Sequence, residues 1–210
     1  RYFFLQEILH EEVKIINKSN CDLIIFPSQN ITSYQVKKKT ISTIHDLMHI
    51  YESRFSEYTK EVIEQRDLHY QRICKFCDGI LVDSLMGKKH VINSYKVKKD
   101  KLLTLPFIAP NYLKKKKRIN IFKKFNLKEK YLFYPAQFWE HKNHIFLIKG
   151  FKEALKNNKN ISLVLCGAKK NNYQKVYDFV IQNKLEKKII FLGRVSDNLM
   201  SSLYTNAMAT

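Results

Sequence analysis

The sequence contains few arginines for a chain with so much positive charge. Only six of its 38 Lys and Arg residues are arginine, while the formal net charge is +19. Such a charge attracts nucleic acids and acidic membranes. Arginine, however, is the residue that reads bases and binds phosphates in a bidentate manner. We therefore interpret the charge mainly as a bias toward lysine, expect no specific nucleic acid partner, and keep attraction to an anionic surface as an alternative.

Cysteines and long apolar runs are also sparse. Of the four cysteines, Cys74 and Cys77 form a single Cys-x-x-Cys pair inside a helical pattern, and no second pair lies at zinc spacing. We expect neither a metal site nor redox chemistry, and four scattered thiols are typical of a reducing cytoplasm. No apolar run approaches the roughly 18 residues of a transmembrane helix.

What the chain has throughout is an alternation of two patterns. Short apolar segments that end at proline or glycine alternate with stretches of helical spacing. Strands are predicted at 23–26, 40–44, 79–82, 101–105, 131–134, 161–165 and 188–192. This alternation predicts an α/β fold with parallel sheets covered by helices on both faces. Residues 113–118, with four consecutive lysines in 114–117, are predicted to link a domain of residues 1–112 to one of residues 119–210.

The stretch after the strand at 131–134 carries the strongest functional signal. Pro135 ends the strand and an apolar stripe of helical spacing begins at Ile145, so Lys142 stands just before a helix N-terminus. Free N–H groups, the positive end of the helix dipole and an ammonium together favour an anion. A solvated surface lysine is the simpler alternative. Parallel sheets bind ligands beyond the carboxyl ends of their strands, and five residues are predicted there: His45, Ser84, Lys142, Gly167 and Gly193.

Six segments of the chain, whose ranges close this paragraph, resemble landmarks of the two-domain glycosyltransferases of family 4, also called group 1. The order and spacing of the segments carry the resemblance. The fourth segment resembles the Gly-Arg-x-x-x-x-Lys donor loop, although Gln137 stands at the position of its arginine. The family's Glu-x7-Glu segment would lie beyond Thr210, and its first strand and Gly-rich loop before Arg1, so we expect a chain truncated at both ends. The segments span residues 43–47, 78–84, 103–110, 134–144, 163–167 and 190–207.

The resemblance implies a GT-B fold of two Rossmann-like domains, both incomplete, that face each other across a cleft. It implies transfer of a sugar from a nucleotide-diphosphate sugar to a glycan or lipid-linked acceptor, with retention and without an obligatory metal or other cofactor. Since the Glu segment is missing, we leave open whether this chain alone is active. A cytoplasmic location, with peripheral contact to an anionic inner membrane face, is expected.

The resemblance also assigns roles to individual residues. Lys142 and His45 are the expected catalytic residues, and the donor nucleotide is expected to contact Gln137, Lys142, Gly167, Gly193, Arg194 and Val195. Simpler interpretations stay open, because His45 could pack at a strand end, the glycines could form plain turns and Arg194 could be an exposed turn residue. We interpret His49, His141 and His144 as local hydrogen-bonders. The alternative function is a basic module that binds nucleic acid or an anionic membrane without catalysis.

Overall fold

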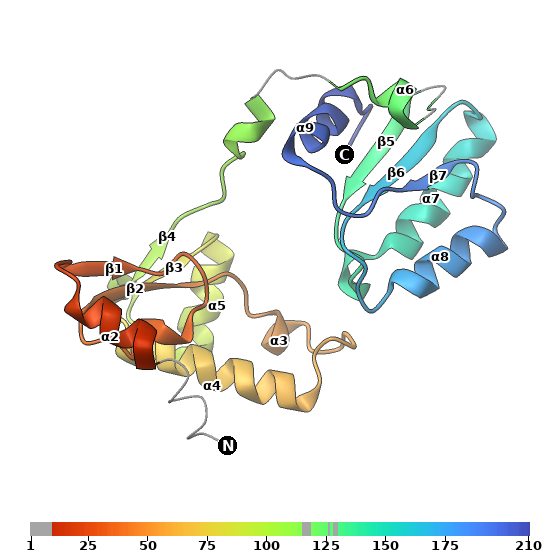
Figure 1. Ribbon diagram of the computed structural model, residues 1–210. Helices are drawn as coiled ribbons and strands as arrows, with labels where there is room; N and C mark the ends of the chain where they lie inside the picture. The colour runs from red at the N-terminus through yellow and green to blue at the C-terminus, as the bar shows by residue number, and fades with distance from the viewer. Residues whose placement is uncertain (1–9, 115–118, 126, 128–129) are drawn as a thin grey trace. The chain divides into compact units, whose positions relative to one another are not determined.

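The chain forms two α/β units, each with its own parallel sheet (Figure 1). The computed structural model describes residues 10–114, 119–125, 127 and 130–210. The units divide between Ile108 and Ala109. Most of the predicted linker lies outside the described residues, so the domain limits 1–112 and 119–210 stay a prediction. The predicted α/β class with two parallel sheets is confirmed.

The first unit contains a four-stranded sheet in the order β1-β2-β3-β4, with all neighbours parallel. Its strands are β1 (Leu23–Ile25), β2 (Lys39–Ile44), β3 (Gly79–Val82) and β4 (Leu102–Thr104). Its helices are α2 (His10–Lys18), α3 (Met48–Tyr51), α4 (Lys60–Phe76) and α5 (Leu85–Tyr95), with 3-10 turns η1 (Ile31–Tyr34) and η2 (Lys99–Lys101). Helix α4 begins at Lys60, because the Thr59 hydroxyl caps it by accepting from the Val62 N–H.

Helices α4 and α5 pack on one face of this sheet. The strands are added in a single direction, and right-handed crossovers then place successive helices on the same side. On the opposite face Leu23, Ile25 and Leu103 stay 44%, 56% and 49% exposed. The expectation of helices on both faces is therefore wrong for the described part of this unit. The core on the covered face comprises Ile44, Leu47, Tyr70, Ile73, Cys77, Ile80, Val82, Val91 and Leu102.

The second unit contains the strands β5 (Tyr131–Pro135), β6 (Ser162–Cys166) and β7 (Ile189–Phe191), parallel and in that order. Its helices are α6 (Ile121–Phe125), α7 (His144–Asn157), α8 (Tyr173–Gln182) and α9 (Asp197–Asn206), with 3-10 turns η3 (Asn111–Lys114) and η4 (Glu140–Lys142). Helices cover both faces here, as predicted. One core joins α7 and α8 to the sheet through Ile148, Phe151, Leu163, Leu165, Val176 and Val180. The other joins α6 and α9 through Ile121, Tyr131, Phe133, Val164, Leu199 and Leu203.

The segment after α9 adds a further parallel contact on the free edge of β5. Leu132 pairs with Ala209 in a parallel bridge, and the Phe133 N–H donates to the Ala209 carbonyl at 2.9 Å. Successive strands β6 and β7 therefore lie on one side of β5, and the segment at Ala209 lies on the other. The order of strands reverses at β5, and such a switch point is where open parallel sheets form their ligand crevice.

Candidate functional site

Three loops of the second unit meet beyond the carboxyl ends of β5, β6 and β7. The loop after β5 is joined to the loop after β6, because the Phe138 N–H donates to the Ala168 carbonyl and the Asn172 N–H donates to the Phe138 carbonyl, both at 3.1 Å. The loop after β6 is joined in turn to the loop after β7, where the Gly167 N–H donates to the Gly193 carbonyl at 2.9 Å. Backbone hydrogen bonds thus hold the three loops together at the strand switch point.

Lys142 ends the short turn η4 in the first of these loops, directly before α7. Asn143 lies between the turn and the helix with φ 51°, a left-handed conformation that asparagine tolerates better than most residues. It makes no side-chain cap, and Lys142 is exposed. The Tyr134 hydroxyl donates to the Lys142 carbonyl at 2.9 Å and so ties this turn back to β5. The predicted placement of a lysine immediately before a helix N-terminus is confirmed.

Gln137 lies in the same loop and is also exposed. Its side-chain oxygen accepts a hydrogen bond from the indole N–H of Trp139 at 3.0 Å. This bond fixes the orientation of the amide, so the NH2 group of Gln137 is left to donate to a ligand. An amide in this position can hold a phosphate oxygen, although it supplies no charge.

Glycine is needed at the two positions of the loop junction for different structural reasons. A Cβ on Gly167 would overlap the carbonyl group of Ala136 and lie 2.8 Å from the Gln137 nitrogen, so the absence of a side chain lets the loop after β5 pack against β6. Gly193 has φ +64°, which glycine adopts without strain, and no atom lies within 4 Å of its Cβ position. Gly167 therefore allows a close backbone contact within the protein, and Gly193 allows a turn with positive φ.

The residues that follow Gly193 point in different directions. Arg194 is exposed, whereas Val195 is half-buried against the core that α9 shares with β5 and β6. The loop after β7 therefore presents Arg194 to solvent beside the glycine junction. Contact of either residue with a nucleobase stays a prediction.

Buried histidines are a feature that sequence reasoning missed. His49 in α3 and His144 in α7 are completely buried, and none of their ring nitrogens makes a hydrogen bond within the described residues. The interpretation of His49 and His144 as local hydrogen-bonders is wrong, because both pack against aromatic rings: His49 against Tyr70, and His144 against Phe138 and Tyr134. Burial lowers the pKa of each to about 4, so both are neutral at pH 7.

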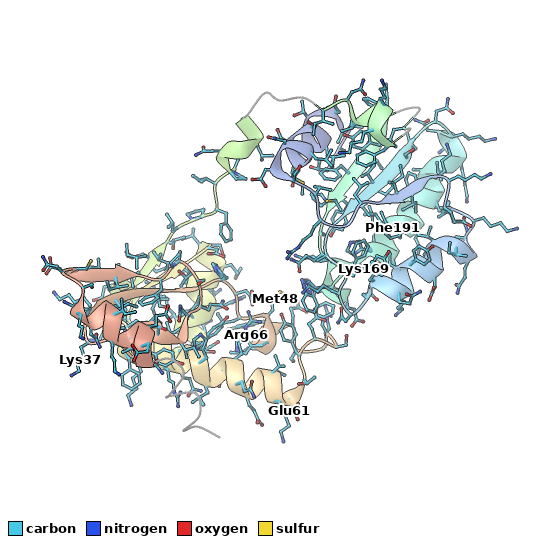
Figure 2. All side chains as sticks on the ribbon, in the orientation of Figure 1. Lys37, Met48, Glu61, Arg66, Lys169 and Phe191 are labelled. Carbon is cyan, nitrogen blue, oxygen red and sulfur yellow. The ribbon has the colours of Figure 1, made fainter. Side chains whose placement is uncertain are left out.

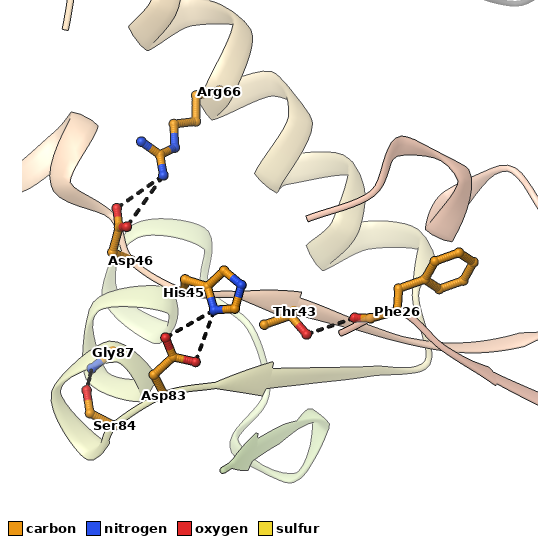
Figure 3. A network of polar contacts seen from close by, with 8 residues as sticks. All are labelled: Phe26, Thr43, His45, Asp46, Arg66, Asp83, Ser84 and Gly87. Atoms are coloured by element: carbon orange, nitrogen blue, oxygen red, sulfur yellow. Dashed lines mark hydrogen bonds and ion pairs between the residues drawn. The ribbon is translucent and has the colours of Figure 1, made fainter. Parts of the chain in front are cut away.

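His45 and Asp83 form the polar centre at the carboxyl edge of the first unit's sheet (Figure 3). The His45 Nδ1 lies 3.1 Å from an Asp83 carboxylate oxygen, and the His45 ring stacks on Phe107 with centroids 5.8 Å apart. The register explains the contact, because Ile44 pairs with Val82 and the two polar residues follow directly. The cap of α5 is made by the neighbouring Ser84, whose hydroxyl accepts from the Gly87 N–H at 2.9 Å, so Asp83 is left to contact His45.

A second ion pair lies beside the first. Arg66 of α4 donates to the Asp46 carboxylate at 3.3 Å (Figure 3). Arg66 also donates to the Tyr70 hydroxyl at 3.0 Å. The ion pair between Arg66 and Asp46 holds the segment after β2 against α4. Neither Arg66 nor Tyr70 was singled out from the sequence, although Arg66 shares a helical stripe with His69 and Ile73.

The two thiols of the Cys-x-x-Cys pair are free and are not bonded to each other. Burial raises the pKa of the Cys74 thiol to about 12, and the Cys77 thiol donates to the Ser33 carbonyl at 3.4 Å. Cys74 is therefore a neutral thiol at physiological pH. Within residues 10–114, 119–125, 127 and 130–210, no group of three or more His, Cys, Asp or Glu side chains could hold a metal ion.

Residues 115–210 match the family model of the glycosyl transferases group 1. This segment resembles that family, and the match covers slightly less than half of the chain. The group 1 segment covers β5 to α9 and therefore contains Gln137, Lys142, Gly167, Gly193 and Arg194. A comparison with curated protein sequences found no significant match.

Several solved structures share the fold of both units. HepE of Anabaena in complex with UDP-glucose has a TM-score of 0.71 at 12% identity, over 97% of this chain and 56% of that one. A glycosyltransferase of Rickettsia africae has a TM-score of 0.64 at 18% identity, over 99% and 55%. A trehalose 6-phosphate synthase of Burkholderia multivorans has a TM-score of 0.66 at 11% identity, over 98% and 54%. The chain spans about half the length of these structures.

The group 1 segment thus brings together one part of the predicted site. Lys142, Gln137, Gly167 and Gly193 lie in the three joined loops, and Arg194 follows Gly193 directly. His45 lies in the first unit, so its approach to Lys142 across a cleft stays a prediction. No helix in the described part of the chain is long and apolar enough to cross a membrane.

Proposed function

We propose that the chain is part of a glycosyltransferase that moves a sugar from a nucleotide-diphosphate sugar to a glycan or lipid-linked acceptor. The transfer proceeds with retention at the anomeric carbon, and it requires neither a metal ion nor a cofactor beyond the nucleotide sugar. The observation that carries the proposal is Lys142, which stands before α7 at the strand switch point of the group 1 segment. UDP-glucose and UDP in complexes of HepE support a nucleotide-sugar donor.

The chemistry of the leaving group explains why Lys142 suits this role. Breaking the bond between the anomeric carbon and the phosphate oxygen leaves the electron pair on the diphosphate, whose negative charge therefore increases. The Lys142 ammonium and the first N–H groups of α7 stabilise that charge in place. The NH2 group of Gln137 donates to a phosphate oxygen. The acceptor hydroxyl oxygen forms the new bond to the anomeric carbon and loses its proton.

The first unit supplies the acceptor side in this proposal. The Asp83 carboxylate orients the His45 ring, and His45 contacts either the donor or the acceptor hydroxyl. Lysine excess gives the chain a formal charge of +19, which supports cytoplasmic enzyme action at an anionic membrane face. The family match does not favour a basic binding module without catalysis.

UDP binding tests the proposal most directly. Trp139 is the sole tryptophan and lies beside Gln137, so its fluorescence reports on the loop while calorimetry gives the dissociation constant. We expect UDP to bind, and Lys142→Ala to raise its dissociation constant about tenfold or more. Lys149→Ala is the matched control, because Lys149 is exposed on the same helix but lies beyond its first turn.

Two outcomes would contradict the proposal. If UDP does not bind the unmodified chain, the proposed donor site does not exist. Equal losses in Lys142→Ala and Lys149→Ala would show general charge attraction instead of a site at the start of α7. Oligonucleotide binding with a steep salt dependence, together with no response to UDP, would favour the basic binding module.

A further inference from the structure

Trp139 links three polar groups at the joined loops of the second unit. Its indole N–H donates to the side-chain oxygen of Gln137 at 3.0 Å. Its backbone carbonyl accepts from the Lys142 N–H at 3.1 Å. The Lys170 ammonium lies over the face of its ring, 4.8 Å from the centroid. The half-buried Trp139 side chain therefore contacts the Gln137 amide and the Lys170 ammonium, while its backbone bonds the backbone of Lys142.

The position of Lys170 is set by the backbone. The loop after β6 is bound on both sides of Lys170 to Phe138, the neighbour of Trp139, through Ala168 and Asn172. The Lys170 carbonyl accepts from the Tyr173 N–H at 3.0 Å, at the start of α8. The backbone contacts that join the loops therefore also fix the backbone of Lys170 beside Trp139.

The charge of Lys170 is left available. The structure gives its ammonium an aromatic face as partner, and a tryptophan ring attracts a cation without neutralising it. Gln137, at the other end of the Trp139 side chain, provides hydrogen-bond donors but no charge. A nucleoside diphosphate carries more negative charge than Lys142 alone neutralises. Lys170 supplies a second cation in the joined loops that carry Lys142.

We propose that Lys170 binds the diphosphate of the donor as the second cation beside Lys142, and that Trp139 positions it. This inference rests on the proposed function, whose donor site it completes. Lys170 is a binding residue for phosphate oxygens, and Gln137 adds the neutral hydrogen bond. The chemical class of the ligand is a diphosphate, whichever sugar and base are attached.

Three probes separate the diphosphate from the rest of the ligand: UDP, inorganic pyrophosphate and uridine. We expect Lys170→Ala to raise the dissociation constants of UDP and pyrophosphate about tenfold, as the loss of a charge-assisted hydrogen bond would. Uridine binding stays unchanged, and Lys170→Arg stays within about threefold of the unmodified chain because it keeps the charge. Lys169→Ala is the matched control in the same loop (Lys169 is labelled in Figure 2). The Lys169 ammonium lies over the Tyr173 ring instead, 4.4 Å from its centroid.

The outcomes distinguish this inference from the proposed function. If UDP binds and Lys142→Ala weakens it while Lys170→Ala does not, the inference is overturned and the proposed function stands. If pyrophosphate binds in a Lys170-dependent manner but UDP does not, the inference stands and the nucleotide-sugar proposal fails. If pyrophosphate does not bind the unmodified chain, the inference is overturned. It is also overturned if Lys169→Ala and Lys170→Ala lose equal affinity for pyrophosphate.

A rescue experiment excludes a merely structural role. Gln137→Arg added to Lys170→Ala places a guanidinium near the same phosphate oxygens, and we expect it to restore most of the pyrophosphate affinity. Absence of rescue together with weaker uridine binding would show that Lys170 only maintains the loop, and would overturn the inference.

Discussion

The imidazole of His144 stacks on the ring of Phe138, with centroids 4.4 Å apart and ring planes inclined by 17°. This contact lies directly beneath the loop that carries Gln137 and Lys142. Burial is the main reason that the pKa of His144 is lowered to about 4; the Ala136 backbone offsets part of this effect, and the charge of Lys142 adds a smaller lowering. The first residue of α7 is therefore a neutral ring that supports the candidate site from inside.

The buried His144 makes the second unit sensitive to acid. Its pKa is about 4 in the folded state and 6.5 in the unfolded state, so the unfolded chain binds more protons between these values. Stability is complete above pH 6.5 and falls as the pH drops toward 4. We expect a loss of about 2–3 kcal/mol between pH 7 and 4.5 from this residue, on the order of 1.36 kcal/mol for each unit of pKa difference. Urea unfolding followed by the fluorescence of Trp139 measures it within the second unit.

His144→Leu is the test of the cause. Leucine keeps an apolar side chain of similar size but cannot be protonated, so the pH dependence of unfolding should become shallower. His49→Leu, in the first unit, should leave the Trp139 signal unchanged. A slope that is identical in His144→Leu and the unmodified chain would show that other groups cause the acid sensitivity.

Gly167 should tolerate no larger residue. A Cβ there would overlap the Ala136 carbonyl group, and that atom belongs to backbone that cannot move without breaking the joined loops. We expect Gly167→Ala to destabilise the second unit by about 2 kcal/mol or more, at the upper part of the range for overpacking. The urea midpoint from Trp139 fluorescence measures the effect.

Gly150→Ala provides the matched control. Gly150 lies within α7, and no atom lies within 4 Å of its Cβ position. Alanine there should stabilise the unit by about 0.5–1 kcal/mol, because glycine is costly inside a helix. If both variants shift the midpoint in the same direction, the close approach of Gly167 to Ala136 is not the cause.

Lys142 should dominate turnover as well as binding. A charge that develops on the leaving diphosphate is stabilised by Lys142 by about 2–4 kcal/mol, so Lys142→Ala should lower kcat by a factor on the order of 10² to 10³. Steady-state transfer from a nucleotide sugar measures it, with Lys149→Ala as control. A loss below about fivefold in kcat would contradict the assignment.

The sequence predicted the positions of the strands well, because apolar segments that end at Pro135, Gly167 and Gly193 leave little choice of boundary. It also placed Lys142 correctly, since a strand, a loop and an apolar stripe suffice for that. Contacts between segments were not predictable in the same way. The overlap of Gly167 with Ala136 and the stacking of Lys170 on Trp139 depend on how loops distant in sequence meet.

The bare face of the first unit's sheet was also missed, although its cause is simple. An alternation of strands and helices does not by itself show whether the helices cover one face of the sheet or both. That depends on the order of the strands in the sheet. Four strands added in one direction place α4 and α5 on one side. The burial of His49 and His144 was missed because histidine is usually only partly buried, and no local pattern marks the exceptions.

His45 and Asp83 should act as a unit in transfer. Asp83 holds the His45 ring from the neighbouring strand at 3.1 Å, so Asp83→Asn removes the charge that orients it while keeping the shape. We expect His45→Ala and Asp83→Asn each to lower kcat for transfer about tenfold or more, with UDP affinity unchanged because the donor loops lie in the second unit. The double variant should lose little beyond His45→Ala, since side chains in contact are not additive.

His90→Ala is the control for this pair, because His90 lies in the same unit but stacks on Tyr51, with centroids 3.8 Å apart. Thermal unfolding followed by circular dichroism shows whether each variant is folded. If His45→Ala retains full transfer activity while Lys142→Ala does not, His45 is a packing residue at the end of β2. A full additive loss in the double variant would instead mean that Asp83 acts independently of the His45 ring.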